Sequence, residues 1–260
     1  MTQGSRADDG LGTGLLHFRG TDARSFLQGQ LSNDMDALDP DSFILAGLHN
    51  PQGRVLALLR LLAPASDHVI AVLPRDLVAA MAATLRRYVL RAKVKIDEEA
   101  DPEAVARLAM RHPAAAPLAT ATARAFDIAA GMPQVYAATS GKFVAQMLNL
   151  DCIGAISFDK GCYTGQEIIA RTHYRGRMKR RMQRFMSATS ISLAPGQAIV
   201  LGDGRSAQVV DAIDHGGATT EFLAVAARPE DIASGNDGAE QAEAMRIECR
   251  PLSLPYAFPD

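Results

Sequence analysis

One cysteine lies in a stretch whose residue types favour thiol chemistry. Cys162 follows Lys160 by two residues, and Thr164 with Glu167 three residues later fits a capping box, which predicts a helix that begins at about residue 165. Free backbone N–H groups at a helix start carry partial positive charge, so this helix and the Lys160 ammonium would both favour the thiolate form of Cys162. The alternative is that Cys162 is a small buried hydrophobe, because free cysteine is among the most buried residue types.

The segment 160–184 is strongly basic, whereas the rest of the chain is acidic. It holds eight basic residues against Glu167 alone, so it carries +7 and the remainder −9 within a net charge of −2. A basic surface of this kind indicates an anionic partner. Arg171 and Arg175 would lie on the predicted helix, and the alternative is that they belong to a solvated helix face.

The composition is that of a soluble globular protein, with 48% hydrophobic and 22% charged residues and no apolar run of about 18 residues. The polar first ten residues have no hydrophobic signal core, so we expect a cytoplasmic protein without membrane contact. Cys152, Cys162 and Cys249 are odd in number and lack the close pairs of a zinc site. Neither a disulfide framework nor a metal centre is expected.

The first half of the chain predicts an antiparallel sheet covered by helices, which is an α+β arrangement. Turn residues between short apolar runs are typical of a meander. The predicted strands are 15–18, 43–48, 54–62, 68–73 and 93–96. The predicted helices are one capped by Thr21 or Asp22 that points Phe26 and Leu27 inward, one over 76–90 with a stripe of Leu77, Met81, Leu85 and Tyr88, and one over 101–111.

Beyond residue 186 the sequence changes to short apolar runs separated by glycine-rich turns at 202–204 and 215–217. This pattern predicts a small C-terminal antiparallel β-barrel. A connector is expected over 112–123 and a long polar loop over 233–244, because both segments lack a hydrophobic period.

Three stretches resemble the YgfZ family, folate-binding relatives of the glycine-cleavage T-protein that support iron–sulfur enzymes. Lys-Gly-Cys-Tyr-Thr-Gly-Gln-Glu at 160–167 is similar to the family signature, 18–34 to its N-terminal block, and 50–54 to its hairpin. The resemblance covers about residues 14–62 and 126–186. It implies a T-protein-like fold, in which residues 1–185 form two interleaved α+β units, the second shortened, and residues 186–260 form the β-barrel.

The resemblance implies a folate-dependent auxiliary protein for the synthesis or repair of iron–sulfur enzymes, including tRNA-modifying ones, with Cys162 as its essential group. Tetrahydrofolate is then the expected cofactor and iron–sulfur enzymes are the expected protein partners. The residues that match the family's folate channel and signature are expected to line the cofactor site: Gln28, Gln30, Asn33, Asp34, Lys160, Tyr163, Gln166, Glu167, Arg171 and Arg175. For the first four, the alternative role is helix-end capping and turn formation.

The chain departs from the T-protein enzymes at their reactive groups. The acidic pair that serves aminomethyl transfer in those enzymes falls at Ala57 and Leu58, and their pterin-binding glutamate falls at Ala129. The chain also has no tryptophan, which the family places beside the folate. Since a hydrophobic pair cannot steer protons, no aminomethyltransferase activity is expected.

Two alternative functions stay open. One is a folate-dependent one-carbon (aminomethyl) transferase, against which the missing acidic pair argues. The other is an RNA-binding module in which the arginines of 171–184 track phosphates, with Tyr174 and Phe185 as the aromatic residues nearby.

Overall fold

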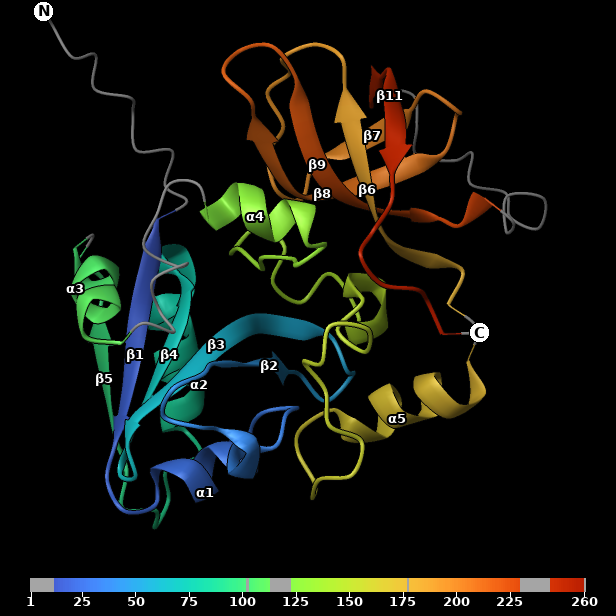
Figure 1. Cartoon of the computed structure of the whole chain (residues 1–260). Coiled ribbons are helices and arrows are strands. Elements are labelled where there is room, and N and C mark those ends of the chain that lie inside the picture. The colour runs from blue at the N-terminus through green and yellow to red at the C-terminus, as the bar shows by residue number, and fades with distance from the viewer. Residues whose placement is uncertain (1–11, 102, 113–122, 177, 230–243, 260) are drawn as a thin grey trace, which may run out of the picture.

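The computed structural model describes residues 12–101, 103–112, 123–176, 178–229 and 244–259. These residues form two sheets, with helices packed on the first and a mainly helical segment between the two (Figure 1). In Figure 1 the first sheet lies at the lower left, the second at the upper right, and α5 below the second. None of the described helices has the length and apolar character that crossing a lipid bilayer demands.

The first sheet has five strands in the order β2-β3-β4-β1-β5, and every neighbouring pair is antiparallel. The predicted meander is confirmed as β2–β3–β4, because short turns join strands that pair with each other. The strands are β1 (Thr13–Arg19), β2 (Ile44–His49), β3 (Val55–Ala65), β4 (His68–Pro74) and β5 (Lys95–Glu99).

The two faces of this sheet pack against different helices, since successive side chains of a strand point to opposite sides. On β1, Leu16 and Phe18 belong to the main core with the helices α1 and α2, whereas Leu15 packs with α3. The helices are α1 (Ala23–Gln28), α2 (Val78–Arg86), which follows the 3-10 helix η2 (Arg75–Leu77), and α3 (Ala104–Arg111). All three were predicted from the sequence, α1 from its expected cap and α2 and α3 from their apolar periodicity.

Two details of these helices differ from the prediction. Asp22 is the N-cap residue of α1, but its carboxylate accepts a hydrogen bond from the backbone N–H of Lys93 instead of capping the helix. α2 ends at Arg86, so Tyr88 lies beyond the helix and is 47% exposed rather than part of the buried stripe.

The segment between the sheets carries α4 (Ala123–Ala129), the 3-10 helix η4 (Ala145–Leu148) and α5 (Gln166–Arg175). Asn149 ends η4 with a left-handed backbone (φ 57°). Its side-chain amide donates to the carbonyl of Met182 and to the hydroxyl of Tyr256, which fixes this turn to the second sheet and to the C-terminal segment that follows it. The expected connector lies largely outside the described residues, as does most of the expected loop 233–244.

The second sheet is a curled half-barrel whose strand order is β10-β7-β8-β9-β6-β11. Its two edge strands do not pair with each other, so the expected barrel is not closed. The hairpin turns at 202–204 and 215–217 are confirmed, because they join β7 to β8 and β8 to β9. The strands are β6 (Arg180–Ser187), β7 (Ala198–Leu201), β8 (Ser206–Asp214), β9 (Thr220–Ala227), β10 (Met245–Ile247) and β11 (Cys249–Leu252).

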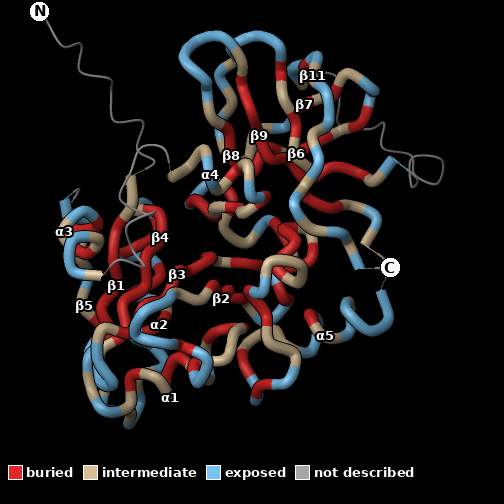
Figure 2. The backbone as a smooth tube through the Cα atoms, in the orientation of Figure 1, coloured by how far each residue is buried: buried red, intermediate tan, exposed pale blue. Residues whose placement is uncertain are grey.

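α4 is tied by ion pairs to both sheets. Asp127 accepts from Arg60 of β3 at 2.5 Å, and Arg124 donates to Asp211 of β8 at 2.5–2.8 Å. Asp211 is fully buried and also accepts from the hydroxyl of Tyr136. Figure 2 shows the buried residues running through the strands of both sheets and the loops between them, so the two sheets are held against one continuous interior.

Candidate functional site

Cys162 lies exposed on the loop that leads into α5, and its thiol is free. A Cβ added at the preceding Gly161 would meet no atom within 4 Å, so the loop is open on that side as well. At the other end of the loop, Gly165 has a φ of +83°, and a Cβ there would come within 2.5 Å of the carbonyl oxygen of Asn50. Only glycine fits this close approach to the β2–β3 turn, which fixes where α5 begins.

The predicted capping box is not formed. α5 begins at Gln166 with Gly165 as its N-cap residue, and no side chain of the described residues caps it. Thr164 therefore stands one position too early to accept from the first turn, because the left-handed Gly165 redirects the chain between them. Gln166 is half-buried and Glu167 exposed in that first turn.

Lys160 is a buried anchor of the loop rather than a charge on its surface. Its ammonium donates to the carbonyl oxygens of Gln28, Leu31 and Asn33 at 2.6, 2.7 and 2.9 Å. Burial lowers the pKa of Lys160 to about 8. The side chain thus joins the cysteine loop to the backbone corner formed by residues 28–34, at the end of α1 and just after it.

Tyr163 anchors the other side of Cys162. Its side chain is buried, and burial raises its pKa to about 12. The ammonium of Lys160 lies 5.3 Å from the centre of its ring, within the range of a cation–π contact. Exposed Cys162 is therefore flanked by two buried side chains, which determine where the thiol is presented.

The four polar residues of the N-terminal block lie in the corner that Lys160 holds. The amide of Gln28 donates to Asp34 at 2.9 Å and accepts from the backbone N–H of Met35 at 2.8 Å. Asn33 donates to the carbonyls of Leu45 and Gly154. Gln30 is half-buried, and within the described residues its side chain has no hydrogen bond.

These contacts match the alternative role of turn formation for three of the four residues. Hydrogen bonds from the backbone N–H of Asp36 and from Gln28 also hold the pKa of Asp34 below its ordinary value. Contact with a cofactor stays a prediction for this corner, and Gln30 has the side chain with the most hydrogen-bonding capacity left.

The outer face of α5 carries exposed charges beside a stack of rings. Arg171, Arg175 and Glu167 line an open hollow together with Tyr174, which is 70% exposed. On the same helix, the ring of His173 stacks on Phe158 with centroids 3.9 Å apart and meets Tyr174 edge-on at 4.9 Å. Sequence reasoning missed this stack, because Phe158 is 15 residues before His173 and only the turn of the loop brings them together.

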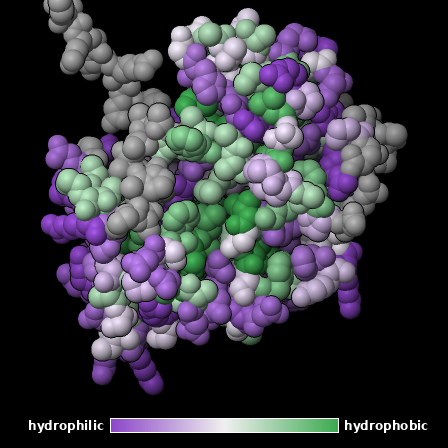
Figure 3. Space-filling view, viewed as in Figure 1, coloured by the Kyte–Doolittle hydropathy of each residue, from purple (hydrophilic) through white to green (hydrophobic). Residues whose placement is uncertain are grey.

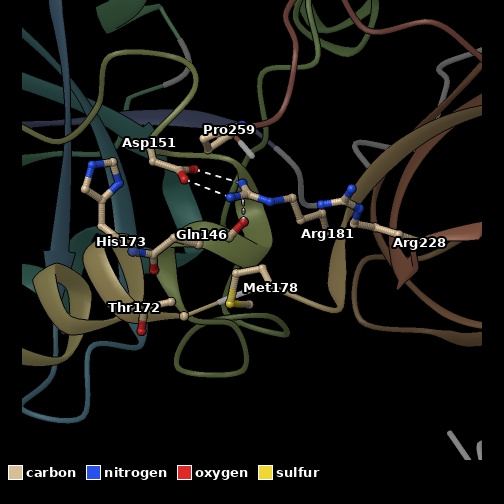
Figure 4. A pocket seen from close by; sticks show the side chains of 9 residues that line it. Gln146, Asp151, Thr172, His173, Met178, Arg181, Arg228 and Pro259 are labelled. Atoms are coloured by element: carbon tan, nitrogen blue, oxygen red, sulfur yellow. Dashed lines mark hydrogen bonds and ion pairs between the residues drawn. The ribbon is translucent and has the colours of Figure 1, made fainter. Parts of the chain in front are cut away.

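A second pocket lies between α5 and the start of β6 (Figure 4). Arg181 of β6 donates two hydrogen bonds to Asp151 at 2.9 and 3.0 Å, and both side chains are buried. The same guanidinium donates to the carbonyl of Gln146 and lies 3.7 Å from the sulfur of Cys152. Burial raises the pKa of Cys152 to about 12, with the Asp151 carboxylate adding to the effect.

His49 is a buried polar residue that the sequence did not single out. It ends β2, is 2% exposed, and neither ring nitrogen has a hydrogen-bond partner in the described part of the chain. Burial lowers the pKa of His49 to about 3, so the ring is neutral. Its ring centre lies 6.2 Å from that of Tyr163, which places it beneath the cysteine loop. Gly47 leaves room for it, since a Cβ there would lie 2.3 Å from the His49 Nε2.

The positions that depart from the T-protein pattern carry no acid. Ala57 and Leu58 are buried in β3, opposite Leu48 and Gly47 of β2. Ala129 is the half-buried last residue of α4. Within the described residues, no three His, Cys, Asp or Glu side chains are grouped so that they could hold a metal ion.

The α+β fold of the chain is similar to that of a glycine-cleavage T-protein. The crystal structure of the glycine cleavage system aminomethyltransferase T from Bartonella henselae is similar over 83% of this chain and 76% of that chain, with a TM-score of 0.60 and 13% sequence identity. At that identity the likeness shows the fold alone. No model of a known protein family matches the sequence.

A relative shows the family more narrowly. Over 210 residues the chain is 30% identical to an uncharacterized protein of Haemophilus influenzae, which corresponds to 71% of this chain and 75% of that protein. The chain belongs to the family of that Haemophilus influenzae protein.

Proposed function

We propose that this chain is a folate-binding auxiliary protein for the synthesis or repair of iron–sulfur enzymes, including tRNA-modifying ones, and that Cys162 is its essential group. The observation that carries the proposal is the free, exposed thiol on a loop that Lys160 and Tyr163 anchor from both sides. That loop is the stretch whose eight residues resemble the YgfZ signature.

The geometry suits a thiol that acts on a large partner. A nucleophile in a small-molecule enzyme is usually recessed, whereas this sulfur stands at the surface where a protein-bound centre can reach it. A thiolate is a soft ligand that favours iron–sulfur clusters, and one thiolate alone can contact a cluster transiently but cannot hold it. The role of Cys162 is thus contact with a partner rather than storage of a cluster.

Two features of the surface of α5 support tetrahydrofolate as the ligand. Arg171 and Arg175 would hold the glutamate tail, since guanidinium groups bind carboxylates with paired hydrogen bonds. The stack of Phe158, His173 and Tyr174 offers flat rings on which the pterin or the aminobenzoate can lie. The bound cofactor would supply one-carbon carriage. Apolar side chains also gather in the middle of the face shown in Figure 3, which offers a second place for flat rings.

The cysteine is tested by complementation. In a strain that lacks the gene, Cys162→Ala is expected to lose most of the restored iron–sulfur enzyme activity, whereas Cys249→Ala, a change at another free cysteine, is expected to keep it. The free energy of unfolding should stay within about 0.5 kcal/mol of wild type in Cys162→Ala, because Cys162 is exposed. In Cys249→Ala it should stay within about 1 kcal/mol, because Cys249 is half-buried. Full restoration by a folded Cys162→Ala protein would remove the thiol from the mechanism.

Folate binding is tested by calorimetry with tetrahydrofolate and the whole protein. Arg175→Gln is expected to weaken binding about tenfold, the loss of one charge-assisted contact. Arg91→Gln, an exposed arginine after α2, is the matched control and should leave binding unchanged. If wild type shows no heat of binding, or if both variants weaken it equally, the surface assigned to folate is wrong.

An RNA-binding function is the second candidate, favoured by the ring stack that lies among the arginines of α5. Bases would stack on the rings while Arg171 and Arg175 contact phosphates. Binding to tRNA should then weaken steeply with salt.

Aminomethyl transfer is expected to be absent, because the matching positions are the buried Ala57 and Leu58. Detection of one-carbon transfer to tetrahydrofolate from an aminomethyl donor would contradict this expectation.

A further inference from the structure

A pocket of ≈ 330 Å³ lies on the face of the first sheet that α3 covers, among side chains that the proposed function does not use. Its floor is apolar and includes Leu15, Ile70 and Leu108. Its walls carry histidines and arginines from β1, β4 and α3, with one carboxylate from β5. The polar lining is His17, Arg19, His68, Glu99, Arg107, Arg111 and His112.

Three of these side chains form a hydrogen-bonded chain. The Nε2 of His17 lies 3.1 Å from Glu99, and the Nδ1 of His17 lies 3.1 Å from the Nε2 of His68. Burial raises the pKa of Glu99, but hydrogen bonds from His17 and Arg107 outweigh this and hold it below its ordinary value. Glu99 is therefore an ionised acceptor, with Arg107 donating to its second oxygen at 2.7 Å.

The chain of hydrogen bonds fixes both histidine tautomers. A carboxylate only accepts, so the Nε2 of His17 must carry the proton, and its Nδ1 is then an acceptor. The proton between the two rings must come from the Nε2 of His68. A neutral His68 consequently keeps an unprotonated Nδ1, which can accept a proton or a hydrogen bond from a ligand.

The same pocket offers donors for an anion. Arg111 lines it from the last turn of α3, and in the described part of the chain it has no acidic partner. Arg107 and Arg19 line it as well, although each is paired, with Glu99 and Asp101 in one case and Asp97 in the other. The lining carries three guanidinium groups against one carboxylate.

We propose that this pocket binds a small phosphate monoester, whose protonated oxygen donates to His68 Nδ1 and whose anionic oxygens accept from Arg111. Two needs select this class. The lone pair on His68 Nδ1 requires a ligand with an acidic O–H that can donate to it. The guanidinium groups require anionic oxygens on the same molecule. An ionised carboxylate or sulfate has no O–H, whereas a phosphate monoester keeps one up to its second pKa of about 6 and can regain it on binding. The apolar floor would take the organic part of the ester.

Binding is expected to be linked to protons. His68 faces Arg19 and His17 of β1, His112 after α3, and Asp67 of the preceding turn, and burial with the nearby positive charges lowers its pKa to about 4. In the free protein His68 is thus neutral at pH 8, and a free phosphate monoester is a dianion. The complex holds one proton more than its separate parts at that pH, whether the proton rests on the phosphate oxygen or on His68.

The test uses calorimetry of the whole protein with phenyl phosphate and with phenyl sulfate, which has a similar shape and no ionisable O–H near neutral pH. Phenyl phosphate is expected to bind at least about tenfold more tightly than phenyl sulfate at pH 6. At pH 8 its binding heat should vary with the ionisation enthalpy of the buffer and correspond to uptake of about one proton. Inorganic phosphate should bind more weakly than phenyl phosphate because it leaves the floor uncovered.

Variants separate the two contacts. Arg111 is exposed, so the Arg111→Gln protein should fold normally. It is expected to bind phenyl phosphate about tenfold more weakly without losing the proton uptake. His68→Phe should remove the proton uptake and the preference over phenyl sulfate. Arg87→Gln, at the exposed end of α2, is the matched control and should change neither.

No saturable binding of phenyl phosphate at millimolar concentration would overturn the proposal. Equal binding of the two esters, or binding without proton uptake at pH 8, would overturn the role of His68. An equal loss in Arg87→Gln and Arg111→Gln would show that the anion is held by general surface charge.

Discussion

Cys152 and Cys162 are ten residues apart and lie in opposite environments. Cys152 is half-buried beside the Asp151–Arg181 ion pair, and its sulfur lies within 3.7 Å of both charged side chains. Cys162 is exposed on the loop that leads into α5, directly after Gly161. Burial and the neighbouring carboxylate favour the neutral thiol at Cys152. Of the two cysteines, Cys152 is therefore structural and Cys162 is accessible.

The difference shows that charge near a cysteine does not by itself make it reactive. Cys152 has an arginine in contact, yet that arginine is already neutralised by Asp151 and shares its buried site. Among the residues that the structure describes, Cys162 has no such contact, since Lys160 turns inward to three carbonyls. Accessibility, and not a nearby cation, is what distinguishes the two sulfurs.

The largest expected effect comes from removing the charge that holds the Cys152 region together. Asp151→Ala leaves Arg181 buried without its carboxylate, which is expected to lower the free energy of unfolding by about 3–5 kcal/mol. Urea denaturation measures this. The matched control is Asp159→Ala, which removes an exposed carboxylate from the cysteine loop and should change the free energy of unfolding by less than about 0.5 kcal/mol. Similar losses of unfolding free energy in both variants would mean that the Asp151–Arg181 ion pair contributes no more to stability than an exposed carboxylate does.

Alkylation of the native protein compares the two sulfurs directly. With a pKa of about 12, Cys152 is about 10³-fold less often a thiolate at pH 8 than a peptide cysteine with a pKa of about 8.5. Iodoacetamide followed by mass spectrometry should therefore label the exposed Cys162 first, and Cys152 should react far more slowly than a peptide cysteine. Comparable rates for the two positions, in a protein that remains folded, would contradict the assignment of Cys152 as structural.

Removal of the Lys160 ammonium tests whether the loop is held in place. Lys160→Met keeps most of the side-chain volume but leaves three carbonyl groups without their donor, so a loss of about 2–3 kcal/mol in the free energy of unfolding is expected. The labelling rate of Cys162 should change by less than about threefold, because the thiol is already exposed. Lys179→Met, at an exposed lysine before β6, is the control. An unchanged stability would show that the corner holds without Lys160.

The sequence predicted local elements well and long-range contacts poorly, and the cysteine loop shows why. Helical and strand periods are set by residues close in the chain, so α3 and the β2–β3–β4 meander could be predicted. The partners of Lys160 are 127 to 132 residues away, and no spacing rule points to them. The capping box failed for a related reason, because the approach of Gly165 to Asn50 overrides the local preference of Thr164.

Barrel closure was equally out of reach of the sequence. Whether a row of strands closes depends on how its two edges meet, and here β10 and β11 stay apart at the ends of the order. The ring stack at α5 and the unpartnered His49 also depend on segments that meet only in the folded chain. Composition predicted a basic surface over 160–184, and the structure confirms this only in part: Arg171 and Arg175 of α5 are exposed, whereas Lys160 and Arg181 are buried.

The smallest expected effect concerns the buried histidine beneath the cysteine loop. His49 has an ordinary pKa of about 6.5 when unfolded and of about 3 when folded, so below pH 6.5 the unfolded chain binds a proton that the folded chain does not. Its contribution is constant above pH 6.5 and is lost as the pH falls. Between pH 6.5 and pH 5 the loss should be about 2 kcal/mol, at 1.36 kcal/mol per pH unit.

Urea denaturation across pH 5–8 measures this loss, and His49→Leu is the informative variant. It removes the titrating group, so its free energy of unfolding should fall by about 2 kcal/mol less than that of wild type over the same interval. Some slope should persist, because burial also lowers the pKa of His17 and of His68. Above pH 6.5, where His49 is neutral in both the folded and the unfolded state, the free energies of unfolding of the two proteins should change with pH in parallel. Parallel curves below that pH as well would mean that His49 gains a proton without unfolding, and the packing of the cysteine loop over it would then be looser than the buried ring of Tyr163 indicates.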